Sequence, residues 1–335
     1  MLPGGLSRGS PTSIDKVGPR HSAARRRTVH GARGLGRPNS ASPVAASSSS
    51  GRPDSTQNAS KVIGSAINDS VCTTVAGVAN RTGDGSAGDA DYATIGTAYS
   101  RYRQPDLRIA ARISQALGAA RTVLNVGAGA GSYEPADREV TAVEPSETMR
   151  AQRPATLAPA VDATAESLPF PDGAFDAAMT TFSVHQWSDL RAGLREMRRV
   201  TRGPVIILTC DPRLLRRFWL TGYAPEVIDT EAGRYPSVGA LSGGLGGSVT
   251  AEVVPIPLDC SDGFNEAYYG RPEALLDPAA RLSCSAWSFV GAAVQDRFTA
   301  DLSSDLADGT WDRRHGHLRV QPTFDGSLIL VTARR

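Results

Sequence analysis

Cysteine is scarce in this sequence of 335 residues, and the four cysteines lie far apart. None belongs to a C-x-x-C pair, and none stands beside a pair of histidines: they are Cys72, Cys210, Cys260 and Cys284. Disulfide-rich secreted domains and zinc sites both need closely spaced ligands. We therefore expect reduced thiols and no bound metal.

Long apolar runs are absent as well. The sequence has no stretch of 18 apolar residues, and no apolar run follows the arginine triplet at residues 25–27. These absences argue against a membrane-spanning helix and against a secretory signal. We expect a soluble protein located in the cytoplasm, with no membrane partner.

Neither sign of charge dominates, because the formal net charge is only +2. The charge is uneven, however: residues 1–90 hold 11 Lys or Arg against 5 Asp or Glu, and the remainder holds 25 against 29. The basic part has no periodic apolar pattern, so it cannot bury enough surface to offset its chain entropy. We expect residues 1–90 to be a disordered tail rich in Ser, Gly and Arg. A cleavable targeting segment and a nucleic-acid-binding arm are the alternatives.

Glycine, in contrast, is abundant, and three glycines follow a short apolar run at alternate positions: Gly127, Gly129 and Gly131. Glycine reaches positive φ and places no Cβ between the main chain and a ligand. A second apolar run ends on Glu144, whose carboxylate can accept hydrogen bonds from both hydroxyls of a ribose. This pattern predicts a nucleotide site at the carboxyl edge of a parallel sheet. Ser132 stands where the dinucleotide fingerprint needs glycine or alanine, which argues against a dinucleotide.

A second phrase, Leu-Pro-Phe-Pro-Asp-Gly-Ala-Phe-Asp, occupies residues 168–176 before another apolar run. Together with Val-Leu-Asn-Val-Gly-Ala-Gly-Ala-Gly at residues 123–131, it resembles the class I S-adenosylmethionine (SAM) methyltransferases. The resemblance is to the type 11 group, which includes the ubiquinone and menaquinone biosynthesis methyltransferases. Arg-Glu-Met-Arg-Arg-Val at residues 195–200 also resembles that group, so the similarity runs from about residue 95 to residue 211.

The resemblance implies an α/β fold with a Rossmann-like sheet of seven strands in the order 3-2-1-4-5-7-6 and helices on both faces. We expect this domain over residues 91–335, with its core at 95–211. Apolar patterns and capping residues predict helices over 106–118 and 190–200. They predict strands over 123–126, 140–143, 175–181, 205–210, 249–258 and 326–333, with a faint third strand near 160–161. Helices at 272–276, 278–294 and 298–306 are expected to form a helical insertion, about residues 259–325, that covers a substrate.

The resemblance also implies SAM as cofactor. Its glycine loop, with Ala128, would pass beneath the methionine part of SAM, and Glu144 would hold the ribose. Pro145 and Met149 would pack on the adenine, and the backbone N–H of Ala165 would face the ring. We expect Tyr99, Tyr102 and Arg103 to close over the SAM carboxylate, because Arg can bind a carboxylate through two hydrogen bonds. The alternative is that these three residues form a surface aromatic and basic segment. Thr181 completes the expected contacts.

Two positions depart from the family pattern. Thr164 stands where an Asp commonly meets the adenine amino group, and Asp162 is near enough in sequence to substitute for it. Asn125 replaces another common Asp beneath the glycine loop, which keeps an acceptor but loses a charge. We interpret both as variation within a binding site.

His185 is the best-placed candidate for a general base, because it follows the strand expected at residues 175–181, where the family places substrate-facing residues. A well-placed base is worth about 10²–10⁴-fold, but it is needed only if the acceptor loses a proton. The alternative is that His185 and Trp187 brace the loop.

The acceptor is expected to be a small molecule. The Asn/Asp-Pro-Pro-Tyr phrase of enzymes that methylate amino groups of nucleic acids is absent, and residues 181–184 read Thr-Phe-Ser-Val instead. The expected function is methyl transfer from SAM with release of S-adenosylhomocysteine. The alternatives are an RNA methyltransferase guided by the basic tail and a SAM-binding protein without catalysis. The oligomeric state cannot be predicted from these patterns.

Overall fold

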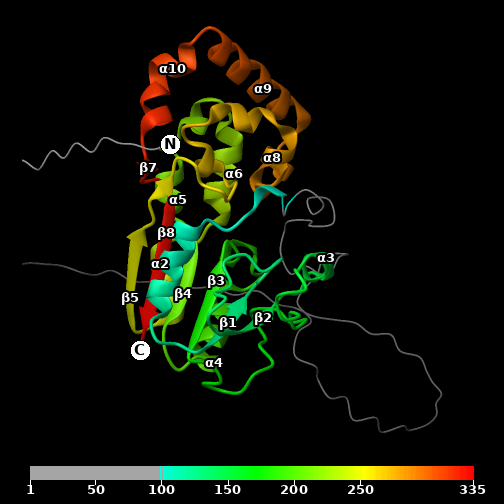
Figure 1. Ribbon diagram of the computed structural model, residues 1–335, viewed down its shortest axis with the longest axis vertical. Coiled ribbons are helices and arrows are strands. Elements are labelled where there is room, and N and C mark those ends of the chain that lie inside the picture. Colours follow the sequence, from blue (N-terminus) through cyan, green and yellow to red (C-terminus); the bar gives the residue numbers. More distant parts are fainter. Residues whose placement is uncertain (1–98, 100) are drawn as a thin grey trace, which may run out of the picture. The chain divides into compact units, whose positions relative to one another are not determined.

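The structure, a computed structural model, describes Tyr99 and residues 101–335 (Figure 1). The tail predicted over residues 1–90 lies outside the described residues. All described residues belong to one structural unit. Among them, no helix combines the length and the apolar character needed to cross a bilayer.

A six-stranded sheet forms the centre of this unit, with the strand order β2-β1-β3-β4-β8-β5. Neighbours from β2 to β4 are parallel, and β8 runs antiparallel between β4 and β5. The strands are β1 (Thr122–Val126), β2 (Glu139–Val143), β3 (Ala177–Thr181), β4 (Val205–Cys210), β5 (Ser248–Val253) and β8 (Leu328–Arg334). A separate pair joins β6 (Ile256–Pro257) to β7 (Thr323–Phe324).

The expectation of seven strands is wrong for the described sheet. The faint strand near residues 160–161 is reduced to one parallel bridge between Val143 and Val161. Pro159, two residues earlier, has no N–H to donate to a ladder. Asp162, one residue later, turns outward to an ion pair with Arg150 at 3.3 Å. These neighbours leave no length of chain for a continuous strand.

Helices cover both faces of the sheet, as the resemblance implies. Met179 of β3 packs in one hydrophobic cluster with α2 (Leu107–Leu117). Its neighbour Ala178 packs in a second cluster with α4 (Leu190–Val200) and α7 (Val238–Leu245). Successive side chains of a strand point to opposite faces, and β1, β3, β4 and β8 each contribute to both clusters.

The helix expected over residues 106–118 is confirmed as α2. Asp106 caps it by accepting a hydrogen bond from the Arg108 backbone N–H, and Gly118 ends it at a φ of 60°. Leu107, the first apolar residue of this helix, is 84% exposed and does not belong to its buried face. Ile109 and Ile113, one helical turn apart, form the buried stripe instead.

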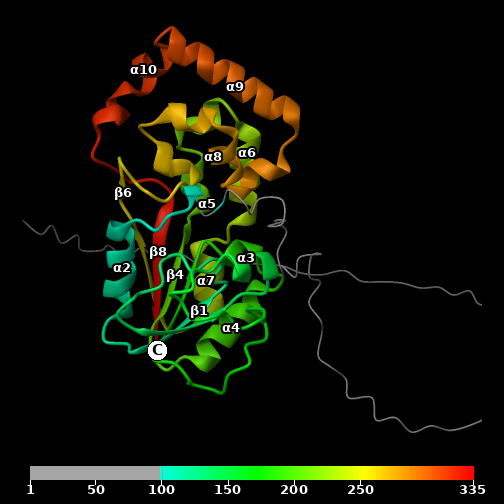
Figure 2. The same ribbon diagram turned by 45° about the vertical axis from the view of Figure 1, so that its right-hand side comes forward.

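Two segments of the chain, residues 211–235 and 256–325, gather beyond one end of the sheet, and we call them the cap (Figures 1 and 2). The second segment contains the insertion that the sequence predicts. The first segment was assigned no structure from the sequence. The cap holds α5 (Pro212–Leu215), η2 (Trp219–Gly222), α6 (Pro225–Arg234), η3 (Asn265–Tyr268), η4 (Pro272–Leu276), α8 (Pro278–Leu282), η5 (Ser285–Phe289), α9 (Ala292–Ala307), α10 (Thr310–His315) and η6 (Gly316–Val320).

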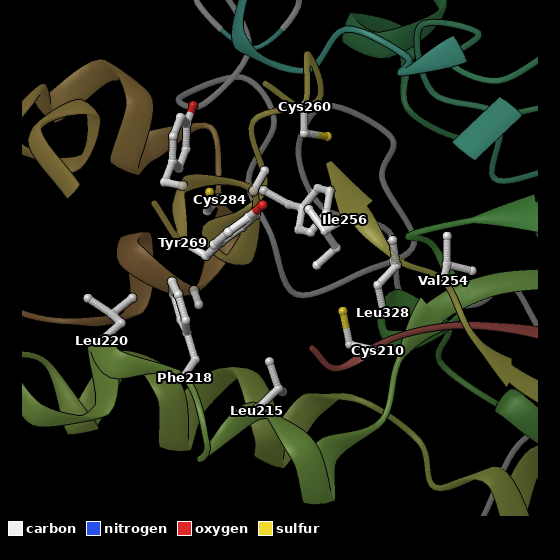
Figure 3. Packing of buried hydrophobic residues seen from close by; sticks show 14 of the residues in the cluster. Cys210, Leu215, Phe218, Leu220, Val254, Ile256, Cys260, Tyr269, Cys284 and Leu328 are labelled. Atoms are coloured by element: carbon white, nitrogen blue, oxygen red, sulfur yellow. The ribbon is translucent and has the colours of Figure 1, made fainter. Parts of the chain in front are cut away.

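One hydrophobic cluster joins the cap to the sheet. Leu215 and Phe218 come from the first cap segment, and Tyr269 comes from the second. They belong to the same cluster as Cys210 of β4 and Leu328 of β8 (Figure 3). The cap and the sheet therefore share a core.

Candidate functional site

The three glycines after β1 all have positive φ: 66° at Gly127, 52° at Gly129 and 97° at Gly131. A Cβ on Gly127 would lie 1.9 Å from the Ser183 Oγ, and one on Gly131 would lie 2.3 Å from the Leu157 Cδ1. Real Cβ atoms do not approach so closely, so these positions need glycine for space as well as for φ. The loop is therefore held tightly against β3 and the segment after β2.

Glu144, directly after β2, is only 7% exposed. One carboxylate oxygen accepts a hydrogen bond from the Gly129 N–H at 2.7 Å, and the other accepts from the Ser146 N–H at 2.9 Å. Ser146 in turn caps α3 (Glu147–Ala151) by accepting from the Met149 N–H. The carboxylate is thus fixed between the glycine loop and α3, and a carboxylate has lone pairs for further donors.

A cavity of about 790 Å³, measured with its opening to solvent, lies over the glycine loop and Glu144, and we call it the cofactor pocket. Ten of the predicted site residues line it: Tyr99, Arg103, Gly127, Ala128, Gly129, Glu144, Pro145, Met149, Ala165 and Thr181. Five others do not: Tyr102, Gly131, Asn125, Thr164 and His185. The residues predicted from the sequence thus line the floor of the pocket.

Asn125 lies beneath the glycine loop and is fully buried. Its side-chain amide donates to the Glu134 carboxylate at 3.1 Å, and Glu134 pairs with Arg153 at 3.0 Å. Both partners of that ion pair are buried. Because Arg153 balances the Glu134 charge, Glu134 does not replace the negative charge that an Asp at position 125 would carry. Thr164 is also buried, 7% exposed, and does not reach the pocket wall.

Several wall residues were not predicted from the sequence, above all Tyr133 and Phe182. Both have positive φ, 65° and 50°, in a region that bulky side chains rarely enter. Such strain is of the order of 1–3 kcal/mol and persists only where surrounding contacts fix it. Tyr133 is fixed by a hydrogen bond from its hydroxyl to Asp262 at 2.8 Å. Positive φ outside glycine leaves no mark in the sequence, so the pattern could not predict it.

Arg103 forms part of the roof of the pocket. Its guanidinium pairs with Asp262 of the cap at 2.6 Å and lies over the rings of Phe182 and Tyr99, at 4.8 and 5.4 Å. The Asp262 carboxylate holds the Arg103 pKa above its usual value, so the guanidinium stays charged. Tyr102 points elsewhere, because its hydroxyl donates to Asp277 at 2.6 Å.

His185 lies in η1 (Val184–Gln186), just after β3, and its ring packs on Tyr235 with centroids 4.6 Å apart. Burial lowers its pKa to about 3, aided by the charges of Arg234 and Arg103. At neutral pH the imidazole is therefore uncharged and a weak base. These features favour a bracing role over general-base catalysis.

His185 lines a second cavity, which we call the chamber and which holds about 370 Å³ of unfilled space. The chamber adjoins the cofactor pocket, because four residues line both: Tyr99, Arg103, Phe182 and Gln186. Its other walls come from η1 and the cap: His185, Glu231, Tyr235, Phe264, Ser283, Cys284 and Ser285. A glycine-floored pocket thus adjoins a smaller, cap-covered space at the end of β3.

Known proteins resemble this chain in the same region. A family of methyltransferase domains matches residues 124–208. The uncharacterized methyltransferase YcgJ of Bacillus subtilis is 33% identical over 115 residues, 31% of this chain and 42% of that protein. A solved structure of a proposed methyltransferase from an antibiotic biosynthesis pathway of Anabaena variabilis is 29% identical. It covers 70% of this chain and 100% of that chain, with a TM-score of 0.66. The chain thus resembles methyltransferases both in the sequence of residues 124–208 and in its fold.

A demethylmenaquinone methyltransferase of Mycolicibacterium gilvum is 45% identical to this chain over 53 residues, 16% of this chain and 23% of that protein. The chain thus matches less than half the length of these curated relatives.

Class I methyltransferases use SAM, and the cofactor pocket of this chain fits that group. Gly127 and Gly129 line the pocket without a side chain, and Glu144 is held rigidly at the pocket wall. Asn125 lies beneath the loop and outside the pocket lining, with a buried side-chain oxygen that has no hydrogen-bond partner among the described residues. A ligand with hydroxyl donors matches the Glu144 carboxylate.

Proposed function

We propose that this chain transfers a methyl group from SAM to a small-molecule acceptor. The observation that carries the proposal is the pair of adjoining cavities at the end of β3. The larger one lies over the glycine loop, and the smaller one lies under the cap. An in-line displacement needs its two reactants side by side and shielded from water.

In this proposal Glu144 accepts hydrogen bonds from the ribose hydroxyls, and Gly127 and Gly129 let the main chain approach the methionine part. Pro145 and Met149 pack on the adenine, beside the backbone of Ala165. Arg103 uses guanidinium N–H groups not engaged by Asp262 to bind the carboxylate of the cofactor.

When bound, SAM supplies a methyl group on a positively charged sulfur, which makes that carbon electrophilic. The residues of the chain then have to orient and enclose the reactants. Phe182 borders both cavities, so its ring separates and aligns their contents. The cap excludes water through Arg103 and Asp262, which join the segment before α2 to the cap.

Calorimetric titration of SAM and S-adenosylhomocysteine into the full chain tests the cofactor site. We expect Glu144→Gln to weaken binding by about 1.5–3 kcal/mol, because hydrogen bonds to a charged group contribute that much. Glu147→Gln is the matched control, since Glu147 is exposed in the first turn of α3. Thermal unfolding checks that both variants remain folded.

Two results would contradict the proposal. One is that the folded wild-type chain binds neither compound. The other is that Glu144→Gln binds as tightly as Glu147→Gln. Release of S-adenosylhomocysteine in the presence of an acceptor then tests transfer itself.

A further inference from the structure

The chamber contains one carboxylate that the proposed function leaves without a role, Glu231 of α6. One of its oxygens accepts a hydrogen bond from the Asn265 side-chain amide at 2.9 Å. The other oxygen receives no hydrogen bond from any described residue, and it is not sealed from solvent. Glu231 therefore presents a carboxylate oxygen that a ligand in the chamber can reach.

Two residues outside the chamber lining, Asn265 and Trp287, fix the orientation of Glu231. The Trp287 indole N–H donates to the Asn265 side-chain oxygen at 3.0 Å, and Trp287 is fully buried. Because that oxygen is engaged, the amide NH₂ of Asn265 faces Glu231. A relay of two hydrogen bonds thus holds the carboxylate in place, as expected for a group that binds something.

The buried Nδ1 of His185 has no hydrogen-bond partner among the described residues, but other polar groups of the chamber are engaged inside the protein. Arg103 is paired with Asp262, and the Ser283 hydroxyl donates to the Ala280 carbonyl at 2.7 Å. Cys284 donates to the Gly263 carbonyl, and burial raises its thiol pKa to about 12, so it is not a thiolate. Glu231 is therefore the acidic group left to meet a ligand.

The remaining walls are aromatic. Phe182 and Phe264 have ring centroids 5.4 Å apart, and His185 packs on Tyr235 at 4.6 Å. Rings of this kind pair favourably with a planar aromatic ligand. The chamber, about 370 Å³ when measured with its opening to solvent, is smaller than the cofactor pocket.

We propose that the chamber binds a planar aromatic acceptor, and that Glu231 accepts the hydrogen bond of its hydroxyl or amino group and takes that proton. This rests on the proposed function, since the chamber adjoins the cofactor pocket. In balance, a carbon–oxygen or carbon–nitrogen bond forms and the carbon–sulfur bond breaks, leaving its electron pair on sulfur. The acceptor proton passes to the Glu231 carboxylate.

The electrostatic setting is consistent with that role. Burial raises the Glu231 pKa above its ordinary value, which makes the carboxylate a better proton acceptor. The hydrogen bond from Asn265 and the charges of Arg234 and Arg103 act in the opposite direction. The contrast is with His185, whose pKa is lowered.

The test uses 2-naphthol and its methyl ether, 2-methoxynaphthalene, with the full chain saturated with S-adenosylhomocysteine. The two probes share a ring system, but only the naphthol has a proton to donate. Fluorescence titration should show naphthol binding at least tenfold more tightly than the ether. Naphthol becomes strongly acidic when excited, so a base beside it yields naphtholate emission. We expect that emission from the bound probe.

Glu231→Gln should remove both the tenfold preference and the naphtholate emission. Glu226→Gln, on the same helix but in an exposed pair with Arg297, should retain both. Equal affinity of the wild-type chain for the two probes would overturn the inference, and that comparison does not depend on any variant. Failure to bind either probe while S-adenosylhomocysteine binds would overturn it too, and leave the proposed function intact. Failure to bind S-adenosylhomocysteine would remove the proposed function itself.

Discussion

Gly118 and Gly127 have nearly the same φ, 60° and 66°, but different surroundings. A Cβ on Gly118 would meet no atom within 4 Å, whereas one on Gly127 would overlap the Ser183 side chain. Gly118→Ala should therefore lower the free energy of unfolding by about 1–3 kcal/mol through backbone strain alone. Its affinity for S-adenosylhomocysteine should not change.

Gly127→Ala should lower the free energy of unfolding further, because Ser183 must also move. It should also reduce affinity for S-adenosylhomocysteine at least tenfold, since the loop forms the pocket floor. Urea unfolding and calorimetry measure the two effects. Unchanged affinity in Gly127→Ala would show that the loop does not contact the cofactor.

Residues whose identity depends on local backbone conformation or on spacing within one stretch could be predicted from the sequence. The glycines need positive φ and space, and Glu144 follows an apolar strand at a fixed spacing, so both are visible in one stretch. Phe182 could not be predicted, because its positive φ depends on contacts made by distant residues. Glu231 was missed for the same reason, because the residues that orient it are distant in the sequence. Asn265 lies 34 residues from Glu231, and Trp287 lies 22 residues from Asn265.

Among the elements, η3 and β8 are connected by a buried carboxylate. Glu266 accepts hydrogen bonds from the Ser327 N–H and from its hydroxyl, the latter at 2.7 Å. Burial raises the Glu266 pKa to about 7 in spite of these bonds. The folded protein thus holds this proton more tightly than the unfolded chain, whose Glu pKa is about 4.3.

This difference predicts the direction of a pH dependence. The contribution of Glu266 to stability should be greatest below pH 4.3 and should fall as the pH rises to about 7. Urea unfolding at pH 5 and pH 8 should therefore show a larger loss of stability in the wild type than in Glu266→Gln. Comparing the two proteins cancels the other titrating groups. An equal loss in both would contradict the raised pKa.

The boundaries of elements could be predicted only where local signals agree with packing. The helix expected over residues 278–294 is broken into α8, η5 and the start of α9. Cys284 and Val290 adopt extended backbone on either side of η5, which places Trp287 in the core against Asn265. The strand expected over 249–258 ends at Val253, and β6 pairs elsewhere, with β7. In both cases a distant contact overrides local propensity.

At the scale of the whole described unit, the cap is not an independent body. Three of the four tryptophans, Trp219, Trp287 and Trp311, lie in the cap and in the cluster that it shares with the sheet. We expect tryptophan fluorescence and far-ultraviolet circular dichroism to report the same urea midpoint, because the shared core makes unfolding cooperative. Separate midpoints would show that the cap unfolds by itself.

The α/β class and the parallel centre of the sheet could be predicted, because fully apolar runs such as β4 are typical of strands buried on both faces. The first cap segment could not be predicted, because its apolar residues become buried only when the second segment packs on them. Leu215 and Phe218, for instance, meet Tyr269 in one cluster (Figure 3). A pairing between segments so far apart leaves no local periodicity to detect.

Different parts of the chain line the two cavities, and this has a consequence for evolution by recombination. Apart from residues shared with the chamber, the walls of the cofactor pocket lie between Gly127 and Trp187, whereas the cap walls of the chamber begin at Glu231. A genetic exchange of residues 211–325 would thus bring in a new chamber wall and leave the glycine loop untouched. The incoming segment would have to supply a carboxylate where Asp262 meets Arg103. Under the proposed function, such an exchange would change the acceptor and keep the methyl donor.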